Sequence, residues 1–117
     1  MSPIFTGRTI WLNGRFLPME SACISPLDRG FLYGDGLFET IRAEEGAALY
    51  LARHIERLCS SLVSFRITID APDWAVVIKS LLIENGLEHG PASVKVIVTR
   101  GAASAPGLPD PEQPTIL

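Results

Sequence analysis

The sequence predicts a small α+β domain in which a meandering, mostly antiparallel sheet carries two helices. Three observations predict this class. Short apolar runs of period two are separated by turn residues, two later segments have the period of amphipathic helices, and a further period-two run follows the second of them. The chain has 117 residues, of which 47% are hydrophobic, and this is enough for one domain with a buried core.

The first pair of predicted strands surrounds Asn13-Gly14. Residues 9–12 form a short apolar run containing Trp11, and residues 15–17 form a second run after the turn. Asn-Gly between two such runs is the strongest short signal of a β-hairpin with a type I′ turn. Pro18 is expected to end the second strand or to keep it at an edge.

A glycine-rich loop and a strand follow at residues 28–42, which read Asp-Arg-Gly-Phe-Leu-Tyr-Gly-Asp-Gly-Leu-Phe-Glu-Thr-Ile-Arg. Its three glycines predict a tight loop shaped by the backbone. From residue 37 to residue 43 the pattern alternates as in a strand, so successive side chains point to opposite faces. One face is mostly apolar and suits a core: Leu37, Glu39, Ile41 and Ala43. The other face carries Phe38, Thr40 and Arg42, a mixture that suits the wall of a polar pocket.

The elements after this strand continue the alternation of strand and helix signals. Residues 44–46 predict a turn, and residues 47–51 a partner strand. From residue 52 the period becomes helical, with an apolar stripe formed by Ile55, Leu58, Leu62 and Phe65. His54 and Arg57 lie three residues apart beside this stripe, so they share a face. Pro72 is expected to be the first residue of a second helix, Gly86 to end it, and residues 92–99 to form another strand.

The chain changes character after residue 100. Residues 101–114 contain two glycines and four prolines, a composition typical of linkers. Residues 115–117 are again strand-like. We therefore expect a small domain at residues 1–100, an interdomain linker at residues 101–114, and the start of a missing C-terminal catalytic domain at residues 115–117.

Composition excludes several classes of function. The formal charge of -3 argues against nucleic acid as the main partner, and no apolar run approaches the ~18 residues of a membrane span. No signal-peptide pattern is visible, and Cys23 and Cys59 do not form a disulfide framework, so a cytoplasmic protein is expected. No Cys/His pair has the spacing of a zinc site, and no metal is expected.

Several motifs together resemble the N-terminal part of the class IV aminotransferases, which are pyridoxal-phosphate enzymes of fold type IV. The loop and strand of residues 28–42 resemble the family's N-terminal signature. The resemblance continues through Trp11-Leu-Asn-Gly, His54-Ile-Glu-Arg-Leu and Val98-Thr-Arg-Gly, in order and at similar spacing. The family includes branched-chain aminotransferases, D-amino-acid aminotransferases and aminodeoxychorismate lyase. The resemblance implies pyridoxal 5'-phosphate as cofactor, an amino acid or 2-oxo acid as substrate, and a homodimer.

The resemblance also implies roles for individual residues. Arg57 resembles the arginine that binds the cofactor phosphate, and a guanidinium suits a phosphate because it offers parallel hydrogen bonds. Phe38, Thr40 and Arg42 resemble the strand that lines the substrate pocket. Tyr33 resembles a tyrosine that reaches the pocket of the partner subunit. Glu39 lies on the apolar face of the strand and is interpreted as structural.

Two departures from the family pattern affect the function. The chain has only Lys79 and Lys95, and neither lies in the context of the family's Schiff-base lysine, so no catalytic residue is expected in this chain. That lysine is expected in the missing C-terminal domain. The second departure is at Ala105, which stands about where D-amino-acid aminotransferases and typical lyases carry an arginine for the substrate carboxylate.

The sequence therefore predicts the N-terminal part of an enzyme that transfers an amino group between an amino acid and a 2-oxo acid. The sequence of the glycine loop slightly favours the aminodeoxychorismate lyase-like branch. The chain alone is expected to be inactive. The alternative is a non-catalytic, stand-alone binding or interaction module derived from that domain.

Overall fold

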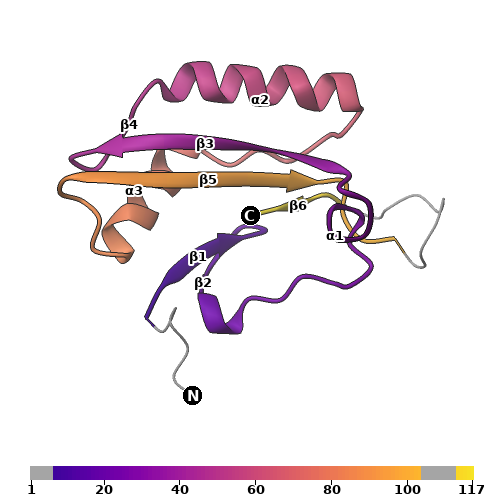
Figure 1. The fold of residues 1–117 in the computed structure, drawn as a ribbon, viewed down its shortest axis with the longest axis horizontal. Coiled ribbons are helices and arrows are strands. Elements are labelled where there is room, and N and C mark those ends of the chain that lie inside the picture. The colour runs from indigo at the N-terminus through magenta and orange to yellow at the C-terminus, as the bar shows by residue number, and fades with distance from the viewer. Residues whose placement is uncertain (1–6, 104–112) are drawn as a thin grey trace.

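Two antiparallel sheets organise the chain in a computed structural model that describes residues 7–103 and 113–117 (Figure 1). A two-stranded sheet joins β1 (Thr9–Leu12) and β2 (Arg15–Pro18). A four-stranded sheet has the order β4-β3-β5-β6, formed by β4 (Ala47–Ala48), β3 (Gly36–Glu44), β5 (Pro91–Thr99) and β6 (Thr115–Ile116). The predicted α+β class with a mostly antiparallel sheet is confirmed.

The hairpin turns at Asn13 and Gly14, which both have positive φ, of 48° and 91°. This is the backbone of a type I′ turn, as the Asn-Gly pair predicts. The hairpin is attached to the larger sheet through Asn13, whose backbone amide donates to the carbonyl of Ile116 and whose side-chain oxygen accepts from the amide of Ile116. Its first strand is attached to a helix by two hydrogen bonds between Thr9 and Asn85.

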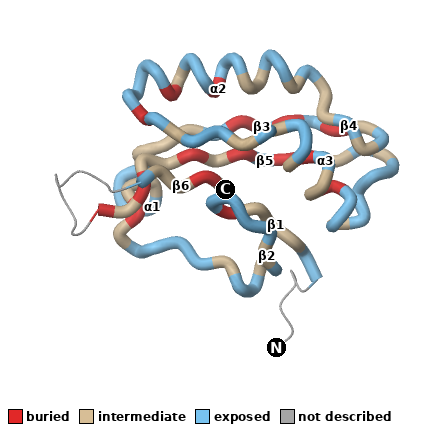
Figure 2. Tube along the Cα trace, turned by 180° about the vertical axis from the view of Figure 1, so that it is seen from behind, coloured by how far each residue is buried: buried red, intermediate tan, exposed pale blue. Residues whose placement is uncertain are grey.

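Strands β3 and β5 are paired along their whole length and supply most of the core. Every second residue is buried from Glu39 to Ala43 and from Val94 to Val98, so the predicted alternation is confirmed there. The buried core lies on one face of the sheet and consists of Ile41, Ala43, Leu58, Leu62, Ile67, Ile78, Leu82, Val94, Val96, Val98 and Ile116. Because this set includes residues of both long helices, the two helices pack against the same buried side of the sheet. Figure 2 shows the buried residues, in red, along the middle of β3 and β5.

Helix α2 (Leu51–Phe65) runs alongside β3 (Figure 1). It begins one residue before the predicted start, and the predicted strand at residues 47–51 is wrong beyond Ala48. Tyr50, with φ of 54°, lies between the two elements and turns the chain into the helix. Phe65 was predicted on the apolar stripe, but it is 54% exposed because the helix ends there, and Ile67 is buried instead.

Helix α3 (Trp74–Glu84) packs beside β1 and β4. Pro72 is not its first residue, contrary to the sequence prediction, because Asp73 takes the N-cap position and accepts a hydrogen bond from the amide of Val76. A carboxylate at that position satisfies an amide that has no partner within the helix. Gly86, with φ of 67°, follows the end of the helix as predicted.

The glycine loop contains a short helix, α1 (Arg29–Tyr33), that sequence periodicity does not predict, and a 3-10 turn, η1 (Met19–Ser21), precedes the loop. Asp28 caps α1 by accepting from the amide of Gly30 at 2.8 Å. Gly34 ends it with φ of 65°. At Gly36 a side chain is excluded by packing, because a Cβ atom there would lie 2.6 Å from the carbonyl oxygen of Val98. The tight loop that the glycines predict is therefore present.

The predicted linker at residues 101–114 lies largely outside the described residues. Its two ends are both attached to the glycine loop. The carbonyl of Gly101 accepts from the amide of Arg29 at 2.8 Å, and the hydroxyl of Thr115 donates to Asp28 at 2.6 Å. Strand β6 then pairs with the end of β5, so residues 115–116 form the edge of the same four-stranded sheet.

Candidate functional site

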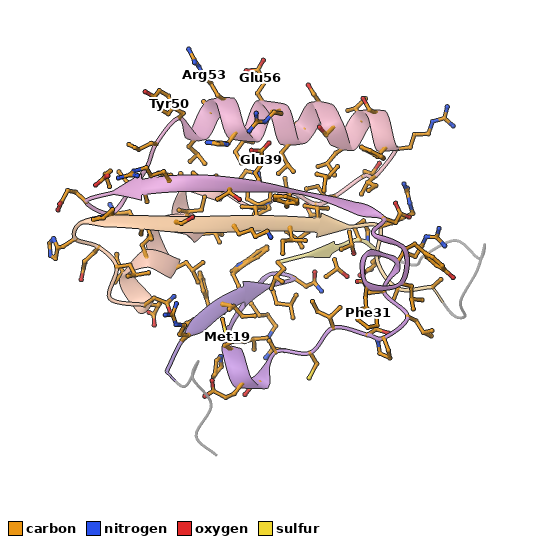
Figure 3. All side chains as sticks on the ribbon, in the orientation of Figure 1. Met19, Phe31, Glu39, Tyr50, Arg53 and Glu56 are labelled. Atoms are coloured by element: carbon orange, nitrogen blue, oxygen red, sulfur yellow. The ribbon has the colours of Figure 1, made fainter. Side chains whose placement is uncertain are left out.

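A buried carboxylate lies between β3 and α2. Glu39 is on the face of β3 that the alternation assigns to the core, and its residue is only 6% exposed. Figure 3 shows its side chain extending from β3 towards the helix. A carboxylate buried among apolar side chains is costly unless charged partners bind it.

Two side chains from one turn of α2 supply those partners. Nε and Nη2 of Arg57 donate to the two carboxylate oxygens of Glu39 at 2.6 and 2.7 Å. Nδ1 of His54 lies 2.8 Å from the oxygen that Nη2 also binds. The spacing of three residues on the helix places both side chains on the same side, as the sequence predicts. We call Glu39, His54 and Arg57 the carboxylate cluster.

The electrostatics of the carboxylate cluster keep Glu39 ionised. The hydrogen bonds from Arg57 outweigh burial, and together with the bond from His54 they lower the pKa of the Glu39 carboxyl from its ordinary 4.5 to about 2. The same hydrogen bonds raise the pKa of Arg57. The pair is therefore fully charged at neutral pH.

Arg57 keeps hydrogen-bonding capacity beyond this pair. A guanidinium has five N–H donors, and Glu39 binds two of them along one edge. Its side chain is 69% exposed, so the far end of the guanidinium is open to solvent. Three free donors at the end of an anchored arginine suit a phosphate or carboxylate, and the chemistry of Arg57 therefore fits the phosphate of pyridoxal phosphate.

The other three residues predicted on β3 lie on the opposite, open face of the sheet. Phe38, Thr40 and Arg42 are all exposed. Lys95, which pairs with Thr40 across the strands, shares this face and places its ammonium 4.5 Å from the centre of the Phe38 ring. Arg42 donates two hydrogen bonds to Glu44, at 2.6 and 3.0 Å. The open face is thus aromatic and basic, and the sequence did not single out Lys95 as part of it.

The structure places Arg57 and these three residues on different sides of β3. Among the described residues, β4 pairs only with Ala43 and Glu44, so the segment from Gly36 to Arg42 has a neighbouring strand on one side only. Arg57 and the open face are therefore separated by the strand itself in this chain.

Tyr33 lies at the end of α1, away from the carboxylate cluster in the fold. It is 52% exposed, and the guanidinium of Arg29 lies 5.0 Å from its ring centre. The neighbouring Phe31 is 75% exposed (Figure 3). This chain alone does not bring Tyr33 to the edge of β3 where Arg57 lies.

Asp35 anchors the glycine loop that carries Tyr33. Nε of Arg29 and Nε of Arg100 both donate to the same oxygen of Asp35, at 2.9 and 2.8 Å. Burial alone would raise the pKa of Asp35, but the hydrogen bonds from Arg100 and Arg29 outweigh it and hold that pKa below its ordinary value. Arg100 also donates to the carbonyl of Phe65 at 2.9 Å and so ties the loop to the end of α2.

Sequence reasoning placed Glu39 on the core face of β3 as a structural residue but did not predict its contacts with His54 and Arg57. The available signal was a carboxylate within an otherwise apolar strand face, together with the His54-x-x-Arg57 spacing. Within residues 7–103 and 113–117, no three His, Cys, Asp or Glu side chains are grouped to hold a metal ion. No helix in that part of the chain is both long and apolar enough to cross a membrane.

A family model described as amino-transferase class IV matches residues 36–117. Aminodeoxychorismate lyase of Bacillus subtilis (strain 168) is 38% identical over 94 residues, and a putative branched-chain-amino-acid aminotransferase of Methanocaldococcus jannaschii is 40% identical over 95 residues. Each alignment covers 79% of this chain and 32% of the relative. The chain therefore spans about a third of the length of these relatives.

Solved structures show the same fold. A branched-chain amino acid aminotransferase of T.th., solved with N-(5'-phosphopyridoxyl)-L-glutamate, has a TM-score of 0.79 and 29% identity over 96% of this chain and 39% of that one. The 4-amino-4-deoxychorismate lyase of Pseudomonas aeruginosa has a TM-score of 0.65 and 35% identity over 91% and 37% of the two chains. The described residues thus have the fold of the corresponding part of these enzymes.

Proposed function

The chain belongs to the amino-transferase class IV family, and from this premise we propose that it forms the N-terminal part of a pyridoxal-phosphate enzyme. The reaction is transfer of an amino group between an amino acid and a 2-oxo acid. A putative branched-chain-amino-acid aminotransferase and an aminodeoxychorismate lyase have similar identities to this chain, so the proposal includes the lyase reaction beside aminotransfer. Residues 1–100 are the small domain and residues 101–114 the linker, and residues 115–116 pair with β5 at the edge of the small domain's sheet before the chain leads into the catalytic domain.

The observation that carries this proposal is the anchored guanidinium of Arg57. Its side edge is bound by Glu39, while its side chain is 69% exposed, so its far end is open to a ligand. Arg57 binds the cofactor phosphate with the donors that Glu39 leaves free. Because the charge of a guanidinium persists at every working pH, this contact holds the phosphate across the pH range of the enzyme.

The open face of β3 forms one wall of the substrate site. Phe38 supplies an apolar surface, Thr40 a hydroxyl and Arg42 a cation that a carboxylate can pair with. Tyr33 reaches the site of the partner subunit in a homodimer. These side chains orient the substrate and exclude water on one side.

Pyridoxal phosphate, when bound, supplies the electron sink that stabilises a carbanion at the substrate. The residues of this chain bind and orient, and the lysine that reacts with the cofactor comes from the catalytic domain. Lys79 and Lys95 are both exposed, so neither has the desolvated surroundings that make a lysine nucleophilic near neutral pH. A cytoplasmic location is consistent with Cys23 and Cys59, which are free thiols.

One pair of assays tests the function in the full-length protein. Pyridoxal phosphate is titrated and followed by its absorbance, and turnover is measured with and without 2-oxoglutarate. Activity that depends on 2-oxoglutarate indicates an aminotransferase, whereas pyruvate released from aminodeoxychorismate without any acceptor indicates a lyase. A protein that binds no pyridoxal phosphate would favour the non-catalytic binding module.

A further inference from the structure

Glu39 occupies a position that an apolar residue would fill at lower cost. Its neighbours on the same strand face, Ile41 and Ala43, are fully buried. Replacing a buried charge pair by well-packed apolar side chains is often neutral or stabilising. We therefore look for the role of this carboxylate in the side chains that it binds, and its two shortest hydrogen bonds are with Arg57.

The contact between Glu39 and Arg57 fixes the direction of the guanidinium. Two parallel hydrogen bonds from Nε and Nη2 define its plane as well as its position, because both carboxylate oxygens are used. One edge of the fork is thus directed into the protein. The three remaining N–H groups, which include both on Nη1, then point away from the core.

His54 fixes the carboxylate in turn. With Glu39 ionised, Nδ1 of His54 donates to the oxygen that also binds Nη2 of Arg57. The His54 side chain is mostly buried, with 19% exposure, and comes from the same helix as Arg57. The carboxylate is consequently held from both sides and has little freedom to rotate.

We propose that Glu39 is a positioning residue, whose buried carboxylate holds the guanidinium of Arg57 so that its free end faces the phosphate of the cofactor. This inference rests on the proposed function. Its physical basis is that an exposed arginine loses the freedom of its side chain when a ligand binds, whereas a clamped arginine has already been ordered by folding.

The charge of Glu39 and its positioning of Arg57 have opposite effects on cofactor affinity. The negative charge of Glu39 repels a phosphate, so removal of that charge alone would strengthen cofactor binding. Glu39→Asp keeps the charge and shortens the side chain by one methylene, and it therefore changes the positioning alone. Glu39→Gln keeps the length but removes the charge and one of the two oxygens that accept from Arg57, so it changes both. The two variants together separate the two effects.

The test compares pyridoxal phosphate with pyridoxal, which lacks the phosphate, in titrations of the full-length protein. Loss of one preordered side chain corresponds to about two- to twelvefold weaker binding. Glu39→Asp is expected to lose that factor for pyridoxal phosphate and to bind pyridoxal like the wild type. An unchanged affinity for pyridoxal phosphate, or an equal loss for both compounds, would overturn the inference.

A double-mutant cycle tests whether Glu39 acts through Arg57. In the Arg57→Ala background, Glu39→Asp is expected to cause no further loss of cofactor affinity, and a full additional loss would contradict the positioning role. If Glu39→Asp melts below the assay temperature, Glu39→Gln is measured instead at about 1 M salt. The Debye length is then about 3 Å, so the repulsion between the Glu39 charge and the phosphate is screened and the loss of positioning remains. Glu39→Gln must then bind pyridoxal phosphate more weakly than the wild type, and equal or tighter binding overturns the inference. Failure of the wild type to bind pyridoxal phosphate would instead overturn the proposed function itself.

Discussion

Arg57 on α2 and Glu39 on β3, eighteen positions apart, are joined by two hydrogen bonds of 2.6 and 2.7 Å. One partner is buried and the other is mostly exposed. The pair therefore connects the core of the domain to its surface. A change at Arg57 is expected to alter stability as well as ligand binding, because Glu39 stays buried when its main partner is removed.

Arg57→Ala is expected to weaken pyridoxal-phosphate binding in the full-length protein. A hydrogen bond to a charged group contributes about 1.5–3 kcal/mol, so the affinity should fall roughly ten- to a hundredfold. The melting temperature should fall as well, because the carboxylate of Glu39 keeps only the hydrogen bond with His54. Cofactor titrations and thermal melts on the same preparations measure the two effects.

Two further variants define the role of Arg57. Arg57→Lys keeps the charge without the fork geometry and should restore the affinity only in part. Arg53→Ala is the matched control, because the side chain of Arg53 points away from the sheet and its guanidinium lies 5.8 Å from the ring of Tyr50 (Figure 3). Wild-type affinity in Arg57→Ala at a temperature where it is folded would show that Arg57 is not the phosphate ligand.

The low pKa of Glu39 predicts a pH dependence of stability. The carboxyl has a pKa of about 2 in the folded chain and 4.5 ordinarily, so folding favours its ionised form. The resulting stabilisation is complete above about pH 4.5 and is lost as the pH falls through 2. Urea unfolding of the wild type and Glu39→Gln between pH 7 and pH 2 should show a difference that shrinks in this window. A difference that stays constant down to pH 2 would contradict the low pKa.

Local signals in the sequence predicted the elements whose structure is set locally. Asn13-Gly14 specified its turn through positive φ, and the alternation from residue 37 to residue 43 correctly separated the open face of β3 from the buried one. The helical period after residue 52 located α2 to within one residue. In each case the determining contacts lie within a few residues along the chain.

Features set by contacts between distant segments were not predicted. Strand β4 is short because Tyr50 starts a helix, and the partners of Glu39 were not predicted because they lie fifteen and eighteen positions away. Alternation shows which face a residue occupies but not which side chains meet it there. The carboxylate cluster therefore required the three-dimensional structure.

The isolated 117-residue chain is expected to form no specific covalent adduct with pyridoxal phosphate. Lys79 lies exposed on α3, and the ammonium of Lys95 lies against the face of the Phe38 ring. Neither lysine lies in an enclosed site that could bind and orient the cofactor aldehyde, so neither should react specifically. Borohydride reduction after incubation with the cofactor, followed by peptide mass spectrometry, should detect no stoichiometric label. Such a label on either lysine would contradict the prediction that the reactive lysine lies outside this chain.

The last prediction concerns the exposed aromatic residues of α1. Phe31 and Tyr33 are 75% and 52% exposed on a loop that Asp35 holds in place through Arg29 and Arg100. Exposed aromatic side chains on a well-anchored segment are typical of an interaction surface. We therefore expect the full-length protein to be a homodimer in which this loop contacts the partner subunit, and the isolated chain to associate more weakly because it contributes only part of the interface.

Sedimentation velocity over a range of concentrations measures this association. Phe31→Ser should shift the full-length protein towards monomer. Tyr33→Ala should do the same and should also weaken substrate binding by the dimers that remain. Tyr50→Asn is the matched control, since Tyr50 is also an exposed aromatic but lies at the start of α2, and asparagine tolerates its positive φ. A fully active monomer would contradict the shared site. In a monomer Tyr33 could reach only the pocket of its own subunit, and the fold of this chain keeps Tyr33 away from Arg57.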